Sequence, residues 1–203
     1  MRNKMILLVL AVCLLFCACE FSLPQIEYGF SREISPEEQA VRLELVGAAQ
    51  QWLGWKESDE SFKPIIDLYN SHQPLAQGYV VKYTDQWCAA FVSAAAIQCG
   101  MTDIIPTECG CQRQIGLFDA IGRWEEEDAY VPLPGDIIYF VLKGDTSADC
   151  TAWSDHVGIV VGTNGNRIKV IEGNNGGAVR YRYISVDDPT IRGYALPDYE
   201  SKT

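Results

Sequence analysis

Apolar residues recur at helical spacing in the first half of the chain, and they form short continuous runs in the second half. The first half therefore predicts helices, and the second half predicts β-strands. We expect the helices to begin the domain and a small, mostly antiparallel sheet to complete it. This order is typical of the α+β fold class.

The first helix is predicted to begin at Ser35, because serine is a preferred N-cap, Pro36 suits the first turn and Glu38 can close a capping box. Apolar residues then recur on one stripe, so this helix should lay one face on a core. Two shorter helices are predicted over residues 62–69 and 112–124, where large apolar residues recur at helical spacing.

Residues 84–100, TDQWCAAFVSAAAIQCG, contain alanines and large apolar residues with almost no polar face. This composition predicts a buried central helix, with Thr84 or Asp85 as the N-cap and Gly100 at the C-terminal end. Cys88 then lies in the first turn, where the helix dipole and free N–H groups stabilise a thiolate. A cysteine on an apolar helix is also common as plain core packing.

The second half contains five runs of β-forming residues separated by turn residues. The predicted strands span residues 136–142, 157–161, 167–171, 178–184 and 191–196. Asp136 and Asp155 stand at turns, so we interpret them as residues that bond the backbone and not as catalysts.

The hairpin that follows His156 decides which polar side chains can meet. A three-residue turn over 164–166 would place His156 opposite Asn174 and diagonal to Glu172, so that all three share one face of the sheet. A two-residue Asn-Gly turn would put Glu172 and Asn174 on the other face. We predict the three-residue turn, and we expect the central helix to pack on the shared face and bring Cys88 to it.

These four residues can supply the parts that a cysteine nucleophile needs. His156 can take the thiol proton and later donate it to a leaving amine, and Glu172 can hold the imidazole in the required tautomer. Asn174 can provide a further orienting or polarising group. The backbone N–H of Cys88 is a natural donor to an oxyanion.

Four further residues are candidates for contact with a substrate. Gln86 and Tyr83 can each supply a second oxyanion donor from the segment before the nucleophile. Trp87 and Trp153 flank the nucleophile and the histidine in sequence and can line a cleft, although aromatic residues near a site are as often walls of the core.

Four separated motifs occur in the order TDQWCAAFVSAA, PLPGDIIYF, SDHVGIVVG and VIEGNNGG. In this order they resemble the CHAP family of cysteine amidohydrolases and peptidases, within the papain-like group that includes the NlpC/P60 enzymes. The similarity covers roughly residues 41–199. It implies a papain-like fold, with Cys88 as nucleophile, His156 as base, and Glu172 and Asn174 as the polar positions that follow.

The resemblance also implies the substrate, which is bacterial peptidoglycan. The bond cut would lie either between muramic acid and L-alanine or within the peptide. Some family members carry a calcium loop rich in aspartates before the cysteine, but this chain has GYVVKYTDQWC with only Asp85, so we expect no calcium site and no cofactor. The competing hypothesis is an inactive surface module that binds wall peptides or a protein partner with the same cleft.

The N-terminus predicts export. Arg2 and Lys4 precede a short apolar run, as in a secretory signal, and Cys19 follows a small residue, as in a lipoprotein signal, so a lipid anchor, simple cleavage and uncleaved anchoring all stay open. The predicted organisation is a signal over 1–19, a tether over 20–34, a catalytic domain over 35–199 and a tail over 200–203. The protein is therefore expected at the cell surface or secreted.

The net charge limits the kinds of binding partner, and the cysteine spacing limits the disulfides that can form. The 203-residue chain has a formal net charge of -11, which argues against nucleic acid or anionic membranes as partners bound through charge. Cys99 lies eleven residues after Cys88, about 16 Å along a helix, so the two cannot bridge. For Cys109, Cys111 and Cys150, a disulfide from Cys150 to one of the other two, a zinc site and three free thiols all remain open.

Overall fold

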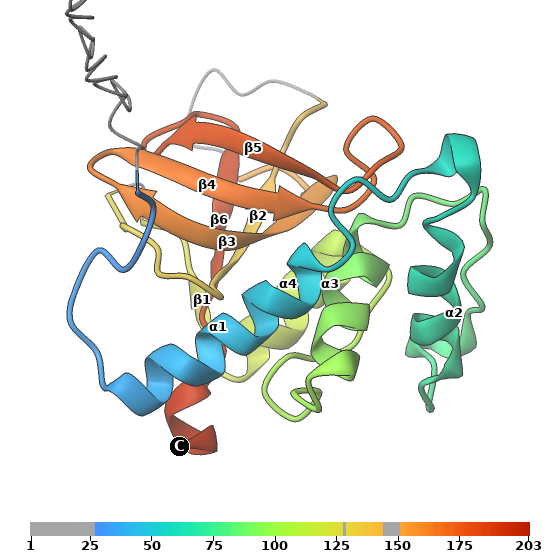
Figure 1. The fold of residues 1–203 in the computed structure, drawn as a ribbon, viewed down its shortest axis with the longest axis horizontal. Helices are drawn as coiled ribbons and strands as arrows, with labels where there is room; N and C mark the ends of the chain where they lie inside the picture. The colour runs from blue at the N-terminus through green and yellow to red at the C-terminus, as the bar shows by residue number, and fades with distance from the viewer. Residues whose placement is uncertain (1–26, 128, 144–150) are drawn as a thin grey trace, which may run out of the picture.

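The computed structural model describes residues 27–127, 129–143 and 151–203, which fold as helices packed on one antiparallel sheet (Figure 1). The helices are α1 (Pro36–Gln50), α2 (Lys63–Ser71), α3 (Cys88–Gln98) and α4 (Cys111–Ala120), with short 3-10 helices η1 (Glu57–Asp59), η2 (Ala76–Gly78) and η3 (Tyr199–Lys202). The strands are β1 (Trp124–Glu125), β2 (Ile137–Phe140), β3 (His156–Asn164), β4 (Arg167–Glu172), β5 (Arg180–Ser185) and β6 (Ile191–Ala195). Their order in the sheet is β1-β6-β2-β3-β4-β5, and the predicted α+β class is confirmed.

The helix starts test the sequence predictions most directly. Ser35 is the N-cap of α1 and its hydroxyl accepts the N–H of Glu38 at 3.1 Å, as predicted. The predicted N-caps of α3 are wrong, because the N-cap position belongs to Trp87. The carboxylate of Asp85 instead accepts the N–H of Lys82 within the preceding turn. Cys88 is nevertheless the first residue of the helix, as its proposed chemistry requires.

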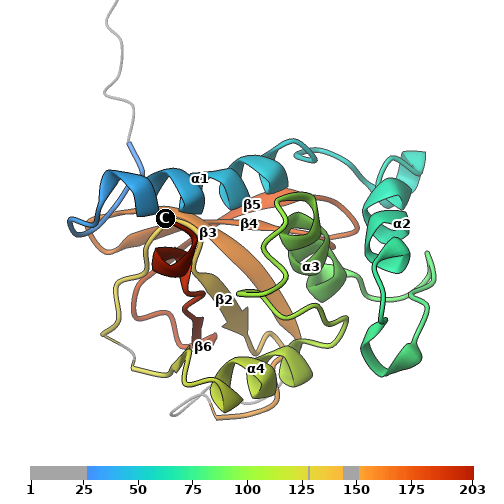
Figure 2. The same ribbon diagram turned by 90° about the horizontal axis from the view of Figure 1, so that it is seen from below.

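Helix α3 is the centre of the larger core. Every residue from Cys88 to Ala96 is buried, which confirms a helix that is apolar on all sides. Figures 1 and 2 show α1, α3 and α4 on one side of the sheet, with α2 on the far side of α3. Gly100 ends the segment with a φ of +66°, as predicted for its C-terminal end.

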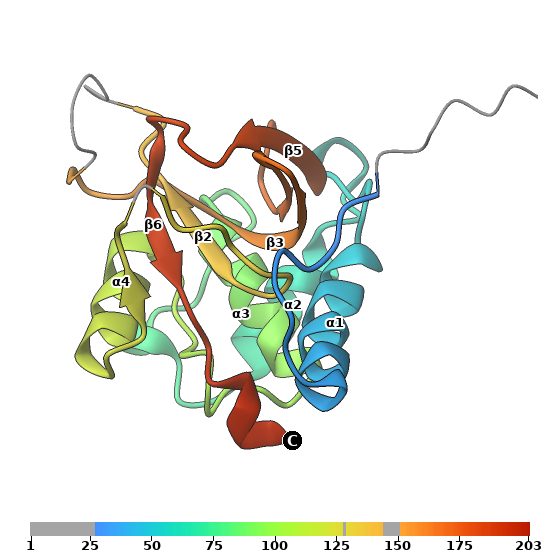
Figure 3. The ribbon, with the colours of Figure 1, turned by 90° about the vertical axis from the view of Figure 1, so that its left-hand side faces the viewer.

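A second, smaller core lies on the other face of the sheet and contains no helical residue. It is formed by Ile138, Phe140, Val160, Ile168, Val170, Ile184 and Tyr194. Figure 3 shows the bend of the sheet whose strands carry these residues. Side chains alternate between faces along a strand, and α3 packs against the face that carries Val157, Ile159 and Ile171. The prediction that the helix covers the face of His156 and Glu172 is therefore wrong.

The β3–β4 hairpin reaches the predicted register by a different route. Asn164 pairs with Arg167, so the turn has two residues and the predicted three-residue turn is wrong. The register shifts by one residue between Val160 and Gly162, where β3 carries a bulge. Beyond the bulge, Val160 pairs with Val170, which restores the alignment that puts His156 and Glu172 on one face.

Two other boundaries differ from the predictions. Helix α4 ends at Ala120, and Trp124, expected in that helix, pairs with Ala195 as part of β1. Residues 200–202, expected in a tail, belong to η3, where the amine of Lys202 contacts the carboxylate of Asp103 at 2.9 Å.

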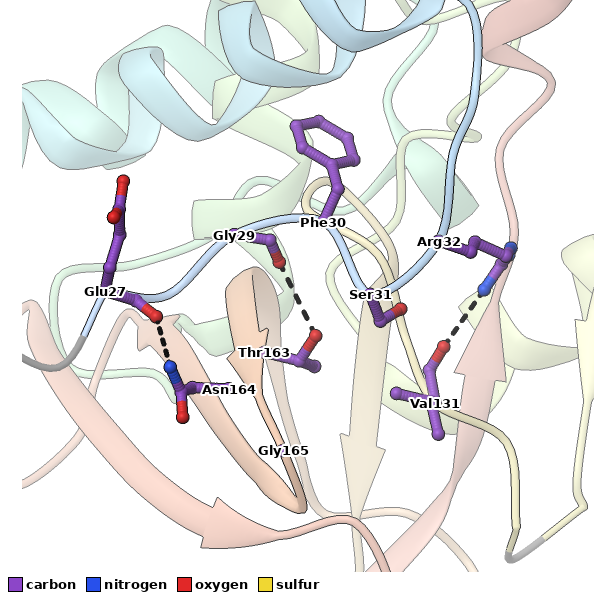
Figure 4. A pocket seen from close by; sticks show the side chains of 9 residues that line it. All are labelled: Glu27, Gly29, Phe30, Ser31, Arg32, Val131, Thr163, Asn164 and Gly165. Carbon is purple, nitrogen blue, oxygen red and sulfur yellow. Dashed lines mark hydrogen bonds between the residues drawn. The ribbon is translucent and has the colours of Figure 1, made fainter.

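The first described residues lie along the sheet and line a hollow of about 760 Å³ (Figure 4). Gly29 exchanges backbone hydrogen bonds with Thr163 near the end of β3, and the guanidinium of Arg32 donates to the carbonyl of Val131 at 3.1 Å. This part of the predicted tether is therefore docked on the domain. The predicted signal and Cys19 lie outside the described residues, and no helix within those residues is both long and apolar enough to cross a membrane.

Candidate active site

Cys88 lies at the N-terminus of α3, and its side chain is almost fully buried. Its pKa is lowered from 9.0 to about 5, because a hydrogen bond from Cys111 and the hydrogen bond and charge of His156 outweigh the opposing effect of burial. The N–H of Ala89 adds a further donor. The sulfur is therefore a thiolate at neutral pH.

His156 is the first residue of β3, so its ring stands at the end of the sheet. Nε2 lies 2.9 Å from Oε2 of Glu172, which leaves Nδ1 as the ring nitrogen for the Cys88 thiol. Burial lowers the pKa of His156, but its hydrogen bonds and charge interactions with Cys88 and Glu172 outweigh that effect and raise it to about 9. Thiolate and imidazolium are both the dominant forms between about pH 5 and 9.

Helix α3 packs on one face of the sheet and the ring of His156 lies on the other, yet Cys88 reaches this ring because His156 lies at the end of its strand. The ring points to the side of the second core, where Phe140 packs on it with centroids 6.1 Å apart. Because His156 begins its strand, no sheet lies beyond it, and the N-terminus of α3 brings Cys88 to the ring around the end of the sheet.

Glu172 ends β4 and has no solvent exposure. Besides His156, it accepts the amide of Asn175 at 2.8 Å and both the Nε and Nη2 groups of Arg182, the latter at 3.1 Å. Burial raises the pKa of Glu172, but the hydrogen bonds and charges of His156 and Arg182 outweigh it and lower the pKa. The carboxylate therefore stays ionised and fixes the ring by charged hydrogen bonds.

Two glycines let these elements approach one another. A Cβ at Gly173 would come within 2.4 Å of Phe91 on α3, so a side chain there would push the helix from the sheet. A Cβ at Gly158 would come within 2.8 Å of Cγ of Glu172. The motifs DHVG and IEGN thus contain glycine where the packing of the site has no room for a side chain.

Asn174 does not join the cluster that the sequence predicts for it. It follows β4 in a left-handed conformation with φ of +58°, and its buried amide nitrogen has no hydrogen-bond partner among the described residues. The neighbouring Asn175 donates to Glu172 instead. The strand ends at Glu172, so the alternation that would carry Asn174 to the shared face stops there.

The candidates on the segment before Cys88 have different surroundings. Trp87 has no solvent exposure, and its ring N–H donates to Glu57 at 2.9 Å, so it is a wall of the core and does not line an open cleft. The hydroxyl of Tyr83 donates to Asp67 at 2.6 Å, so it is already engaged outside the cluster.

Two candidates remain open to solvent. Trp153 is 81% exposed, three residues before the catalytic candidate His156. Gln86 is exposed and lines a hollow of about 300 Å³ together with Tyr79, Val81, Asp85, Cys109 and Arg113. The hollow is formed by the segment that leads into α3 and by residues on either side of the start of α4, and Cys88 and Cys111 are the first residues of these two helices.

Sequence reasoning missed two neighbours of the site. Cys111 stands just before the helix predicted over 112–124, but it is the first residue of α4, and its sulfur lies 3.6 Å from that of Cys88. Arg182 gave one usable signal, because it lies on the strand that pairs with β4, two residues from the partner of Glu172.

The other cysteines bear on the disulfide and zinc hypotheses. Cys88, Cys99, Cys109 and Cys111 are free thiols, whereas Cys150 lies outside the described residues, so the disulfide that the sequence allows for it stays open. In the part of the chain that the structure describes, no group of three or more His, Cys, Asp or Glu residues is placed to hold a metal ion.

In the part of the chain that the structure describes, four α-helices and an antiparallel sheet bring a cysteine, a histidine and a glutamate together at the start of the central helix, as the resemblance to papain-like enzymes implies. Residues 78–174 match the family model of the CHAP domain, in agreement with the resemblance that the sequence motifs carry. The matched segment includes Cys88, His156 and Glu172.

Solved structures with a similar course of the chain include the crystal structure of Ly7917, which is 16% identical, with a TM-score of 0.45 over 78% of this chain and 62% of Ly7917. The crystal structure of Ly7917 with the hydrolyzing product of MDP is also 16% identical, with a TM-score of 0.43 over 77% of this chain and 62% of that one. The chain thus spans less than two thirds of Ly7917. None of the curated proteins matches it.

Proposed function

We propose that the protein is an exported cysteine hydrolase that cleaves amide bonds of bacterial peptidoglycan, as an N-acetylmuramoyl-L-alanine amidase or a peptide endopeptidase. The observation that carries this proposal is the chain of contacts from Cys88 through His156 to Glu172, within the segment that matches the CHAP family model. The buried, ionised carboxylate and the lowered pKa of Cys88 are what such chemistry requires.

The hydrolysis begins with the thiolate of Cys88, which attacks the carbonyl carbon of the scissile amide. As the first residue of α3, Cys88 has a backbone N–H without an intrahelical acceptor, and this group can donate to the oxyanion. His156, protonated at neutral pH, gives its proton to the departing amine and leaves a thioester on Cys88. The neutral imidazole then activates water, which releases the acid and restores the thiolate.

Substrate binding is assigned to the open side of the site. The exposed ring of Trp153 can pack on a sugar or a peptide, and Gln86 lines the hollow beside the nucleophile segment. Asp85 and Arg113 in the same hollow offer opposite charges to the amines and carboxylates of a peptide. Trp87 is not included, because it is buried.

Export rests on the N-terminal sequence, in which Arg2 and Lys4 precede an apolar run and Cys19 follows Ala18. We propose a lipid anchor through Cys19. In a bacterial host, labelled fatty acid should be incorporated into the protein and lost from the Cys19→Ala variant. Equal labelling of the two proteins, or none in either, would overturn the anchor while leaving the hydrolase proposal intact.

The decisive experiment compares the protein with its Cys88→Ala variant on purified peptidoglycan. We expect the variant to lose all measurable release of fragments, since it lacks the nucleophile. The matched control is Cys99→Ala, a half-buried cysteine just past the other end of α3, which should keep the activity.

Mass spectrometry of the fragments identifies the bond that is cut. Free lactyl groups on muramic acid indicate an amidase, and new amines within the peptide indicate an endopeptidase. Equal release by the protein and by Cys88→Ala would refute the hydrolase and leave the inactive binding module as the better hypothesis.

A further inference from the structure

A second buried thiol lies against the nucleophile. The sulfur atoms of Cys88 and Cys111 are 3.6 Å apart, and both side chains are buried. Each cysteine is the first residue of a helix, Cys88 of α3 and Cys111 of α4, so two helix N-termini converge on one pair of sulfur atoms. Hydrolysis of an amide needs only one nucleophilic thiol, so Cys111 can support the thiolate of Cys88 by a hydrogen bond but performs no bond-making step of that reaction.

The two sulfur atoms differ in protonation. The pKa of Cys88 is lowered to about 5, with the hydrogen bond from Cys111 as the largest cause. The pKa of Cys111 is raised well above its ordinary value, first by its hydrogen bond to Cys88, then by burial and by the charge of Cys88. At neutral pH the pair is therefore one thiolate and one thiol that donates to it.

We propose that Cys111 is a resolving cysteine and that Cys88 and Cys111 form a reversible disulfide when a peroxide oxidises the nucleophile. In the first step the thiolate of Cys88 attacks one oxygen of hydrogen peroxide, the O–O bond breaks, and Cys88 becomes a sulfenic acid as hydroxide leaves. In the second step the sulfur of Cys111 attacks the sulfur of Cys88. The S–S bond forms, the S–O bond breaks, and the departing hydroxide takes the Cys111 proton as water.

The first step itself prepares Cys111 for the second. Once Cys88 is a sulfenic acid, its negative charge is gone. Two of the four contributions that raise the pKa of Cys111 are then lost, namely the hydrogen bond to the Cys88 thiolate and the charge of that thiolate. The backbone N–H at the start of α4, which lowers this pKa, remains. A disulfide needs an S–S distance of about 2.05 Å, so the sulfur atoms must close by about 1.5 Å from their 3.6 Å separation, which side-chain rotation at two helix starts can supply.

The other described cysteines are poorer partners for Cys88. Cys99 follows the far end of α3 and is separated from Cys88 by the length of the helix. Cys109 lies in the loop before α4, where its sulfur accepts the guanidinium of Arg113 at 3.8 Å. Only Cys111 among the described residues has its sulfur in contact with that of Cys88.

The consequence of the pair is protection of the nucleophile. A sulfenic acid without a neighbouring thiol is oxidised further to sulfinic and sulfonic acids, which thiol reductants do not restore. A disulfide stops this sequence and is reversed by thiol reductants. The site would therefore switch off under peroxide and recover afterwards, without loss of the enzyme.

The test treats the full-length protein with hydrogen peroxide and maps the products by peptide mass spectrometry without reduction. We expect a cross-linked peptide pair containing Cys88 and Cys111, lighter by about 2 Da than the two thiol peptides, and its loss after dithiothreitol. In Cys111→Ser and Cys111→Ala we expect Cys88 to gain about 32 or 48 Da instead, and dithiothreitol should not reverse it. Cys109→Ser and Cys99→Ser are the matched controls and should form the same cross-link as the wild type.

The mass spectrometry needs no peptidoglycan, so its result is independent of the proposed function. The predicted loss and recovery of hydrolysis, in contrast, rest on the proposed function. Irreversible oxidation of Cys88 in the wild type at the rate of the Cys111 variants would overturn the inference. So would a cross-link that joins Cys111 to Cys150 and leaves Cys88 to oxidise alone. Should both Cys111 variants fail to fold, the products of the wild type alone decide between these outcomes.

Discussion

Two buried carboxylates in this domain are each paired with an arginine, yet their pKa values are shifted in opposite directions. Asp136, next to β2, accepts Arg42 of α1 at 2.8 Å, and Glu172 accepts Arg182 of β5. Neither carboxylate has any solvent exposure. The pKa of Asp136 is raised, because burial outweighs its partners, and the pKa of Glu172 is lowered, because its partners outweigh burial.

The difference follows from the number of cations. Asp136 faces one cation, and its other donors, the N–H of Leu133 and the hydroxyl of Tyr130, are neutral. Glu172 faces a guanidinium and an imidazolium. A single ion pair compensates burial only in part, whereas two cations keep a buried carboxylate charged. The first arrangement suits the joining of a helix to a sheet, and the second suits the holding of a charged base.

The largest expected effect is on catalysis, and it comes from Glu172→Gln. The amide keeps the shape of the side chain but lacks the negative charge. In the wild type this charge holds the ring of His156 and raises the pKa of His156. We expect kcat/KM to fall on the order of 10³-fold, or about 4 kcal/mol. The measurement is the rate of peptidoglycan hydrolysis beside a thermal unfolding curve. A wild-type rate in a well-folded variant would show that another residue orients the imidazole.

The next effect is on stability, and it comes from Asp136→Asn. This change leaves the buried guanidinium of Arg42 with only the carboxylate of Glu38 as its charged partner. We expect the free energy of unfolding to drop by about 3 kcal/mol, measured by urea titration, with the rate per folded molecule unchanged.

The control for this variant is Asp59→Asn, which breaks the exposed pair with Lys56. An exposed pair contributes little to stability because water screens it, so the control should unfold at nearly the wild-type urea concentration. Equal destabilisation of the two variants would show that burial of the Asp136 pair has no special consequence.

A smaller change is expected at Arg182, and it concerns pH. Activity requires the thiolate of Cys88 and the imidazolium of His156, so it should rise through about pH 5 and fall through about pH 9. Arg182→Gln removes a positive charge near His156, and the loss of this repulsion favours the protonated ring. The alkaline limb of the pH profile should therefore move to higher pH, while kcat should drop about tenfold. Arg182→Lys keeps the charge and should hold the limb near 9. An unmoved limb in Arg182→Gln would contradict this electrostatic role.

The smallest expected effects are on kcat, and they should differ between substitutions of the two asparagines after β4. Asn175→Ala removes one hydrogen bond to Glu172 and should reduce kcat about threefold to tenfold. Asn174→Gly keeps the left-handed backbone and should cost less, because the amide of Asn174 bonds no part of the cluster in the described structure. Kinetics of the two variants at one pH suffice. A larger loss in Asn174→Gly would restore Asn174 to the site.

The sequence contained enough to place the secondary structure and the cysteine–histidine–glutamate contact. Helical periodicity, the Ser35 cap and the runs of β-formers are local signals, and they predicted the elements with small errors at their ends. The shared face of His156 and Glu172 was also predicted, but for the wrong reason. A two-residue turn and a bulge near Val161 together produce the register that a longer turn alone was expected to give.

The missed parts are those that depend on tertiary structure. Nothing local to Cys111 says that α4 will start beside α3, and the side of the sheet that α3 covers depends on where each face finds apolar partners. Arg182 is similar, because its partner lies on the neighbouring strand. Asn174 was misplaced because the strand ends two residues before it.

The docked N-terminal segment changes where the folded unit starts. The sequence places that start at Ser35, yet Gly29 already pairs with Thr163, and Asn164 donates to the carbonyl of Glu27 at 2.6 Å. A protein trimmed to Ser35 would uncover the backbone of Thr163 and offer it to other chains for strand pairing. Truncated versions made for crystallisation or assays should therefore retain Glu27 and the residues after it.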